Sequence, residues 1–111
     1  MTFTVRFSAE AEANVHRIHD WIVERSPRGA LSWLDALQQA RATLENSANS
    51  FGLAAEAVLV DEDLRQILFR ARRGNPYRAL FVIRANVVHI VSIRGTGQEL
   101  LQPGDIDLPE D

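Results

Sequence analysis

The stretch "LRQILFRARRGNPYRALFVIRANVVHIVSIR", residues 64–94, decides the fold of this chain. It contains three runs of β-branched, aromatic and aliphatic residues, which are typical of β-strands. Turn-forming residues separate the runs: Gly74 and Pro76 follow the first, and Ala85 and Asn86 follow the second. Consecutive strands joined by such short turns pair antiparallel, so the stretch predicts a three-stranded meander. The expected strands cover residues 64–71, 77–83 and 87–94.

The last two strands of this meander are expected to be apolar on both faces. With a two-residue loop between them, Phe81 faces Ile90 and Val82 faces His89. A half-solvated antiparallel sheet shows one polar face, so each face here must be covered. A pair of helices can cover one face, while the C-terminal tail, a second copy of the chain or a partner would cover the other. Simple alternation gives one face the residues Tyr77, Ala79, Phe81, Ile83, Val88, Ile90, Ser92 and Arg94. It gives the other face Arg78, Leu80, Val82, Arg84, Val87, His89, Val91 and Ile93.

The residues before the meander predict one strand and two helices. Residues 2–7, "TFTVRF", alternate in polarity and favour a short strand. Ser8 is a good helix N-cap, and apolar residues recur behind it at helical spacing until about Ser26, which precedes a proline. Pro27 can begin a second helix, which is expected to end within "NSANSFG", residues 46–52.

The short connection between these helices predicts an antiparallel αα-hairpin. Trp21 and Trp33 are interpreted as the large hydrophobes of its packing. Residues 52–63 are compatible with either a short helical turn or an ordered loop. An N-terminal strand, an αα-hairpin and a C-terminal three-stranded antiparallel meander together make an α+β fold.

The composition is that of one small domain with a single modest core. The chain has 111 residues, of which 46% are hydrophobic and 24% charged. It contains no cysteine, which excludes disulfides and thiolate metal sites and favours a reducing compartment. His16 and His19 have no third ligand at convincing spacing, so no metal or other cofactor is expected. The sequence has neither a signal-peptide pattern nor a run of membrane-spanning length, so we expect a cytoplasmic domain without membrane contact.

Charge is distributed unevenly along the chain, although the formal net charge is only −3. Residues 1–63 carry −5, residues 64–98 carry +7 with no Asp or Glu, and residues 99–111 carry −5. All 12 basic residues are arginine, which excludes a lysine general base. The arginines either form a basic surface for an anionic partner or are neutralised by the chain's own acids.

The order of elements and several short motifs resemble the RelE/ParE superfamily of toxins from type II toxin–antitoxin systems. The resemblance extends from residue 3 to about residue 98. It is carried by "FSAEAE" at 7–12, "LRQ" at 64–66, "YRALF" at 77–81 and the hydrophobic strand that ends at Arg94. It implies one toxin domain over residues 1–98, followed by an acidic tail over residues 99–111.

The resemblance implies a growth-inhibiting toxin of the plasmid-stabilisation type that a cognate antitoxin neutralises in a hetero-oligomer. An exposed apolar surface with a basic rim suits an acidic amphipathic segment of such a partner. For each arginine the alternative is an ion pair with an acid of the same chain, for example between Arg65 and Glu56. The residues expected to bind a partner are Arg65, Arg70, Arg72, Arg73, Arg78, Leu80, Val82 and Arg84.

Two kinds of target occur in this superfamily: ParE-like toxins inhibit DNA gyrase, and RelE-like toxins cleave mRNA on the ribosome. RNA cleavage needs a base, an acid and cations around the scissile phosphate. The best set for that chemistry here is Arg73, Arg78, Arg94, His89 and Glu99, with Arg72 as an alternative to Arg73. The missing lysine, and the missing histidine and tyrosine after the last strand, favour the non-catalytic ParE-like mechanism.

A third interpretation is an inactive toxin relative that serves only as a protein-interaction module. A nucleic-acid-binding domain is also conceivable from the number of arginines. However, the arginines are not interleaved in the sequence with aromatic residues on which bases could stack.

Overall fold

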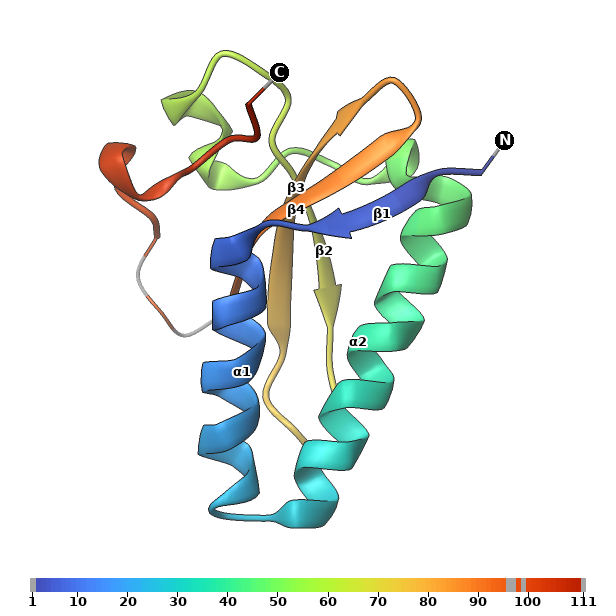
Figure 1. Ribbon diagram of the computed structural model, residues 1–111, viewed down its shortest axis with the longest axis vertical. Coiled ribbons are helices and arrows are strands. Elements are labelled where there is room, and N and C mark those ends of the chain that lie inside the picture. Colours follow the sequence, from blue (N-terminus) through green and yellow to red (C-terminus); the bar gives the residue numbers. More distant parts are fainter. Residues whose placement is uncertain (1, 96–97, 99, 111) are drawn as a thin grey trace.

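The computed structural model describes residues 2–95, 98 and 100–110. Two helices lie on one face of a four-stranded sheet, and irregular segments cover the other face (Figure 1). The strands are β1 (Thr4–Phe7), β2 (Arg65–Phe69), β3 (Tyr77–Arg84) and β4 (Val87–Gly95), and the helices are α1 (Ala9–Val23) and α2 (Pro27–Ser47). Short 3-10 turns cover Ala48–Ser50, Ala55–Leu59 and Pro103–Asp105. The predicted α+β architecture is confirmed.

Side-chain caps define where the two helices begin. The Ser8 hydroxyl accepts a hydrogen bond from the Ala11 amide at 3.0 Å, which satisfies one of the free N–H groups of α1. The Ser26 hydroxyl does the same for the Gly29 amide of α2 at 2.9 Å. Pro27 occupies the first turn of α2, where it has no N–H to leave unpaired. Neither helix in the described residues is long and apolar enough to cross a membrane.

The sheet has the strand order β1-β4-β3-β2, so β1 and β2 are its edges. β1 is parallel to β4, whereas β2, β3 and β4 form the predicted antiparallel meander. The hairpin between β3 and β4 has the expected register, with Phe81 opposite Ile90 and Val82 opposite His89. Ala85 adopts a φ of 54° in the two-residue loop, a left-handed conformation that non-glycine residues rarely adopt.

Because of a β-bulge at Val91, the side chains of β4 are distributed between the two faces of the sheet differently from the sequence prediction. Leu80 pairs with Ser92 and Phe81 pairs with Ile90, so two residues of β4 lie opposite one step of β3. Beyond the bulge every side chain changes face, because the period of a strand is two residues. The predictions that Ser92 and Arg94 share the face of Phe81, and that Ile93 lies opposite, are therefore wrong.

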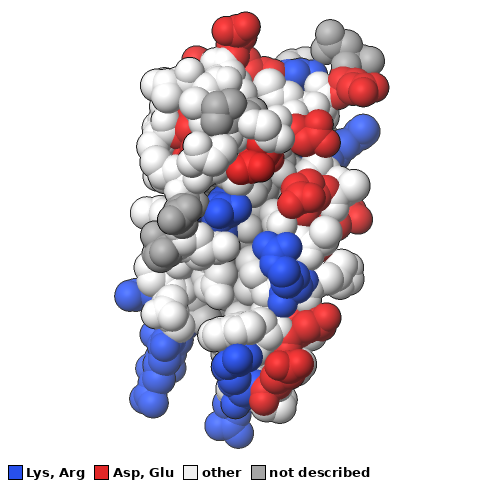
Figure 2. Space-filling model, turned by 90° about the vertical axis from the view of Figure 1, so that its left-hand side faces the viewer, with Lys and Arg blue, Asp and Glu red and all other residues white. Residues whose placement is uncertain are grey.

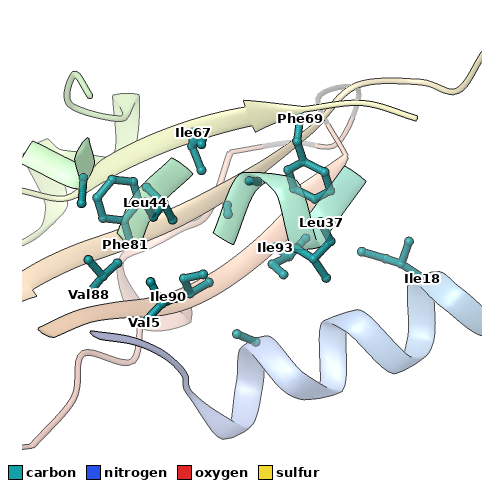
Figure 3. Close-up of a cluster of buried hydrophobic side chains, with 14 of the residues drawn as sticks. Val5, Ile18, Leu37, Leu44, Ile67, Phe69, Phe81, Val88, Ile90 and Ile93 are labelled. Carbon is teal, nitrogen blue, oxygen red and sulfur yellow. The ribbon is translucent and has the colours of Figure 1, made fainter. Parts of the chain in front are cut away.

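The principal core lies between the helices and the sheet (Figure 3). Leu37 and Leu44 of α2 meet Phe81 and Ile90 of the sheet there, and all four side chains are buried. Trp33 also belongs to this core as a buried large hydrophobe, and its ring packs against Phe69 of β2 and Tyr77 of β3.

The prediction that Trp21 is a large hydrophobe of the hairpin packing is wrong. Its side chain is 53% exposed, and the guanidinium of Arg25 lies over its ring, 3.8 Å from the centroid. The buried stripe of α1 continues from Ile18 to Ile22, which also packs against the core, and Trp21 lies to one side of that stripe. The sequence pattern alone did not separate it from the buried stripe.

The chain itself covers the second face of the sheet. Leu80 and Val82 of β3 and Val91 of β4 form a second buried cluster with Leu64 and Leu101. The segment between α2 and β2 and the C-terminal residues 100–110 lie side by side over this cluster (Figure 1). The sequence left three possible covers for this face: the C-terminal tail, a second copy of the chain or a partner. The C-terminal segment covers part of the face, and the α2–β2 connection, which was not among the three, covers the rest.

Candidate functional site

Arg78 is buried in an ion pair with Glu56 rather than exposed on a basic surface. Its two terminal nitrogens donate to the two carboxylate oxygens of Glu56 at 2.7 and 2.5 Å. Gln66 accepts a further bond from Arg78 at 3.3 Å, and the Leu101 amide donates to Glu56 at 3.1 Å. The hydrogen bonds from Arg78 hold the pKa of Glu56 at about 2, against an opposing effect of burial. The pair fastens both covering segments to the sheet.

Arg84 and Arg65 are also engaged within the chain. Arg84 donates to both carboxylate oxygens of Glu62, at 2.6 and 3.2 Å, and to the Pro109 carbonyl at 2.6 Å. These bonds lower the pKa of Glu62. Arg65 donates to the Phe51 carbonyl at 2.5 Å and lies 3.7 Å from Asp63. The expected pair of Arg65 with Glu56 is not formed, because Arg78 takes that carboxylate.

The structure thus divides the eight residues expected to bind a partner. Three arginines are paired internally, and Leu80 and Val82 are fully buried under the chain's own segments. Arg70, Arg72 and Arg73 remain exposed, and none of them makes a side-chain hydrogen bond or ion pair within the described residues.

The structure brings two of the candidate catalytic residues together, since Arg78 of β3 and Arg94 of β4 are direct cross-strand neighbours, but it places His89 apart from them. His89 and Arg94 are five residues apart on β4, a separation of roughly 15 Å along an extended strand. Arg73 lies on the β2–β3 loop, and Arg78 is committed to Glu56. Burial lowers the pKa of His89, and the nearby charges of Arg84 and Arg6 lower it further against Glu62. Glu99 lies outside the described residues.

A groove runs beside the edge strand β2. It has a volume of about 320 Å³ and lies between β2 and α2. Leu68 of β2 is 59% exposed at this groove, and Arg70 lies at its end. The lining consists of Ala36, Gln39, Ala40, Thr43, Phe51, Ile67, Leu68, Phe69 and Arg70.

The backbone of β2 is free at the same place. The backbone N–H of Gln66 points away from β3, since it donates to the Gly52 carbonyl. In an antiparallel ladder the outward direction recurs every second residue, so the backbone groups of Leu68 also point away from β3. No backbone bond to Leu68 from outside its own sheet is present in the described part of the chain. The edge can therefore accept another extended segment.

A larger pocket of about 710 Å³ lies between the α1–α2 connection and the β2–β3 loop. Arg72 and Arg73 line it from the loop, and Arg28 lines it from the start of α2. Figure 2 shows arginine side chains projecting from the lower end of one face of the molecule, the end at which Figure 1 places the connection between the helices. This pocket shares no lining residue with the β2 groove.

The family model of the ParE toxin of type II toxin–antitoxin systems, parDE, matches residues 5–100. The chain belongs to this ParE toxin family. A solved structure described as the chromosomal ParDE TA system from P. aeruginosa is similar, with a TM-score of 0.67 and 22% sequence identity. The match covers 85% of this chain and 96% of that chain, and it supports the same fold. No curated protein matches this chain in sequence. The resemblance inferred from the sequence is thereby confirmed, down to its ParE-like branch.

Two features of this ParE-family chain were missed from the sequence. The first is the pairing of Glu56 with Arg78, for which a lone acid within the apolar run "LAAEAVLV" is a signal of a buried pair. The second is the role of Arg28, which is 44 residues from Arg72 in the sequence and carries no local signal. Only the fold brings these two arginines to one pocket.

Proposed function

We propose that this ParE-family chain is an active toxin and that a cognate antitoxin neutralises it by occupying the β2 groove. The observation that carries this proposal is the free backbone edge at Leu68 beside the β2 groove. An extended segment placed there gains main-chain hydrogen bonds, and alternate side chains of that segment enter the groove.

The chemistry of the groove favours an acidic amphipathic segment as the occupant. Its walls combine the apolar side chains Ile67 and Phe69 of β2 and Ala36 and Ala40 of α2 with the polar side chains Gln39 and Thr43. Arg70 supplies a cation for a carboxylate of the partner. A segment that is flexible when free can order on such a surface, and the resulting complex is a hetero-oligomer that is inactive as a toxin.

We further propose that the toxin inhibits DNA gyrase by binding it rather than by cleaving mRNA. The distance of His89 from Arg94 along β4 supports this choice, because phosphodiester cleavage needs its groups around one phosphate. The engagement of Arg78 with Glu56 removes a further cation from that role. The chain also has no lysine to act in its place.

The groove is tested by expressing the toxin in a bacterium together with the antitoxin encoded beside it. We expect Leu68→Asp and Arg70→Glu to arrest growth as the unmodified chain does, but to need at least tenfold more antitoxin for rescue. Leu31→Asp is the matched control, because Leu31 is also exposed, at 70%, and lines neither pocket. Rescue of Leu68→Asp at the normal antitoxin dose would show that the groove is not the binding site.

The target is tested with the purified chain in two assays run side by side. We expect it to inhibit the supercoiling of relaxed plasmid by DNA gyrase and to leave cell-free translation and its mRNA intact. Cleaved mRNA with unaffected supercoiling would support the RelE-like mechanism instead. If neither assay responds and induction does not slow growth, the chain is an inactive relative.

A further inference from the structure

The pocket between the helix connection and the β2–β3 loop has the features of a separate ligand site. Its volume of about 710 Å³ is within the range of small-molecule sites, roughly 300–1,000 Å³. Its lining residues come from α1, from α2 and the residue that caps it, from the loop before β3, and from the first residue of β3. They are Trp21, Ile22, Ser26, Arg28, Gly29, Ser32, Trp33, Ala71, Arg72, Arg73, Gly74, Asn75 and Tyr77.

The charge of the pocket is positive and uncompensated. Arg28, Arg72 and Arg73 line it, and the lining contains no carboxylate. In contrast to Arg78 and Arg84, these three make no ion pair or side-chain hydrogen bond within the residues the structure describes. Three guanidinium groups around one cavity repel one another, and a bound anion relieves that repulsion. Planar guanidinium groups match phosphate oxygens with paired hydrogen bonds.

The other walls of the pocket are aromatic. Trp21 is the most exposed of them, and Arg25 covers one face of its ring from 3.8 Å. Tyr77 and Trp33 meet edge to face with their ring centres 5.6 Å apart. Burial raises the pKa of Tyr77, so its hydroxyl stays protonated and can donate a hydrogen bond.

A buried donor beside the pocket also has no partner. Trp33 is 1% exposed, and its indole N–H has no hydrogen-bond acceptor in the described residues. A buried N–H without an acceptor costs free energy, and in native proteins such groups usually have a partner. Because Trp33 lines the pocket, a ligand with acceptor atoms can supply one after a small adjustment of the ring.

We propose that this pocket binds a nucleotide, with the phosphate held by Arg28, Arg72 and Arg73 and the base placed against the aromatic walls. Stacking on aromatic side chains and guanidinium contacts to phosphate are the two interactions by which proteins hold single nucleotides. Asn75 at the rim offers an amide that can read the edge of a base. The ligand is either a free nucleotide or one unit of a single strand, since both present the same chemistry. This proposal is independent of the antitoxin groove and of the gyrase assay.

An acidic peptide is the competing occupant, because carboxylates also pair with arginine. The pocket favours a nucleotide because it combines three cations around one cavity with the accessible rings of Trp21 and Tyr77, whereas the β2 groove offers a free strand edge, a mixed lining and one cation. A nucleotide, with a flat base and an adjacent phosphate dianion, fits the pocket, whereas an extended amphipathic peptide fits the β2 groove.

The purified chain is titrated with dTMP, thymidine, inorganic phosphate and the single strand dT8, with tryptophan fluorescence and calorimetry as the two readouts. We expect dTMP to bind and quench fluorescence, and thymidine and phosphate to bind at least tenfold more weakly. The double variant Arg72→Ala/Arg73→Ala is expected to weaken dTMP binding at least tenfold. Arg17→Ala is the matched control, an exposed arginine outside the pocket that should leave binding unchanged.

The two sources of the ligand are separated by comparing dTMP with dT8. Binding of dT8 no tighter than dTMP identifies a free nucleotide, and tighter binding that falls with salt identifies a strand. A second variant, Trp21→Leu, should weaken dTMP but leave inorganic phosphate unchanged, since only the base contacts the ring.

Three results overturn the proposal. The first is no binding of dTMP or dT8 at millimolar concentration. The second is binding that Arg72→Ala/Arg73→Ala and Arg17→Ala reduce equally, which shows attraction to general positive charge. The third is a Glu- and Leu-containing peptide that binds more tightly than dTMP and depends on the same two arginines.

Discussion

Replacing Glu56 by glutamine should weaken this fold more than a typical single substitution. Glu56 is 1% exposed and accepts two hydrogen bonds from Arg78 and one from the Leu101 amide. A carboxyl whose pKa falls from 4.5 to about 2 contributes about 3 kcal/mol of stability when it is ionised. Glu56→Gln preserves the shape but leaves the Arg78 guanidinium buried without a counter-ion, which typically costs about 3–5 kcal/mol. We therefore expect a loss of about 3 kcal/mol at pH 7.

The pH dependence of this loss follows from the direction of the pKa shift. Because the pKa of Glu56 is lower in the folded chain, its contribution is complete above the unfolded value of 4.5. It fades as the pH falls from 4.5 toward about 2, where the folded carboxyl takes up a proton. The difference between the unmodified chain and Glu56→Gln should therefore shrink by about half at pH 3.

Urea unfolding followed by circular dichroism at pH 7, 4 and 3 measures the loss of unfolding free energy in Glu56→Gln and its dependence on pH. The double variant Glu56→Leu/Arg78→Met is the control, because replacing both members of a buried pair by apolar residues is often neutral. We expect it to recover at least about 2 kcal/mol of the loss that Glu56→Gln causes. A loss below about 1 kcal/mol at pH 7, or an equal loss at pH 7 and pH 3, would refute the reasoning.

Three further predictions concern the backbone and the C-terminal cover. Ala85→Gly should raise the free energy of unfolding by about 0.5–1 kcal/mol, since Ala85 has a φ of 54° that glycine adopts without strain, and thermal unfolding measures this. Asn14→Leu should lower stability by about 1–3 kcal/mol, because the Asn14 side-chain oxygen accepts from the buried Ile93 amide at 2.9 Å beside the bulge; an unchanged urea midpoint would contradict this. Arg84→Ala should speed amide hydrogen exchange in residues 105–110 but not in α2. The variant removes the hydrogen bond from Arg84 to the Pro109 carbonyl, which holds the C-terminal segment and does not involve α2. Equal exchange in the variant and the unmodified chain would show that this bond does not hold the segment.

The three exposed arginines near the end of β2, Arg70, Arg72 and Arg73, lie on two distinct surfaces. Arg70 lies at the end of the β2 groove, and Arg72 and Arg73 line the pocket near the helix connection. The two predicted functions can therefore be removed separately. Arg70→Glu should impair rescue by the antitoxin and leave dTMP binding intact, whereas Arg72→Ala/Arg73→Ala should do the reverse.

Local sequence by itself determined the elements and their order. The cap at Ser8, the proline at position 27 and the two-residue loop at Ala85 and Asn86 act through neighbours only a few residues away. Their consequences could be worked out without the fold, because hydrogen bonding and backbone sterics at these positions are local. The same holds for the register of the hairpin as far as Phe81 and Ile90.

Only the tertiary structure decided which faces and charges meet. The bulge at Val91 reversed the alternation of β4, and the sequence does not mark such a one-residue slip because apolar residues occupy both faces of the strand around it. Glu56 pairs with Arg78 rather than with Arg65 because the fold places Glu56 on the second face of the sheet, beside Arg78. The two residues of this pair are 22 positions apart in the sequence. The arginines of the loop, which have no aromatic neighbours of the required spacing in the sequence, lie beside Trp21 and Trp33 because two helices deliver those rings to the same pocket. Each of these contacts joins residues far apart in the chain, and a pattern read over a few neighbouring residues carries no information about them.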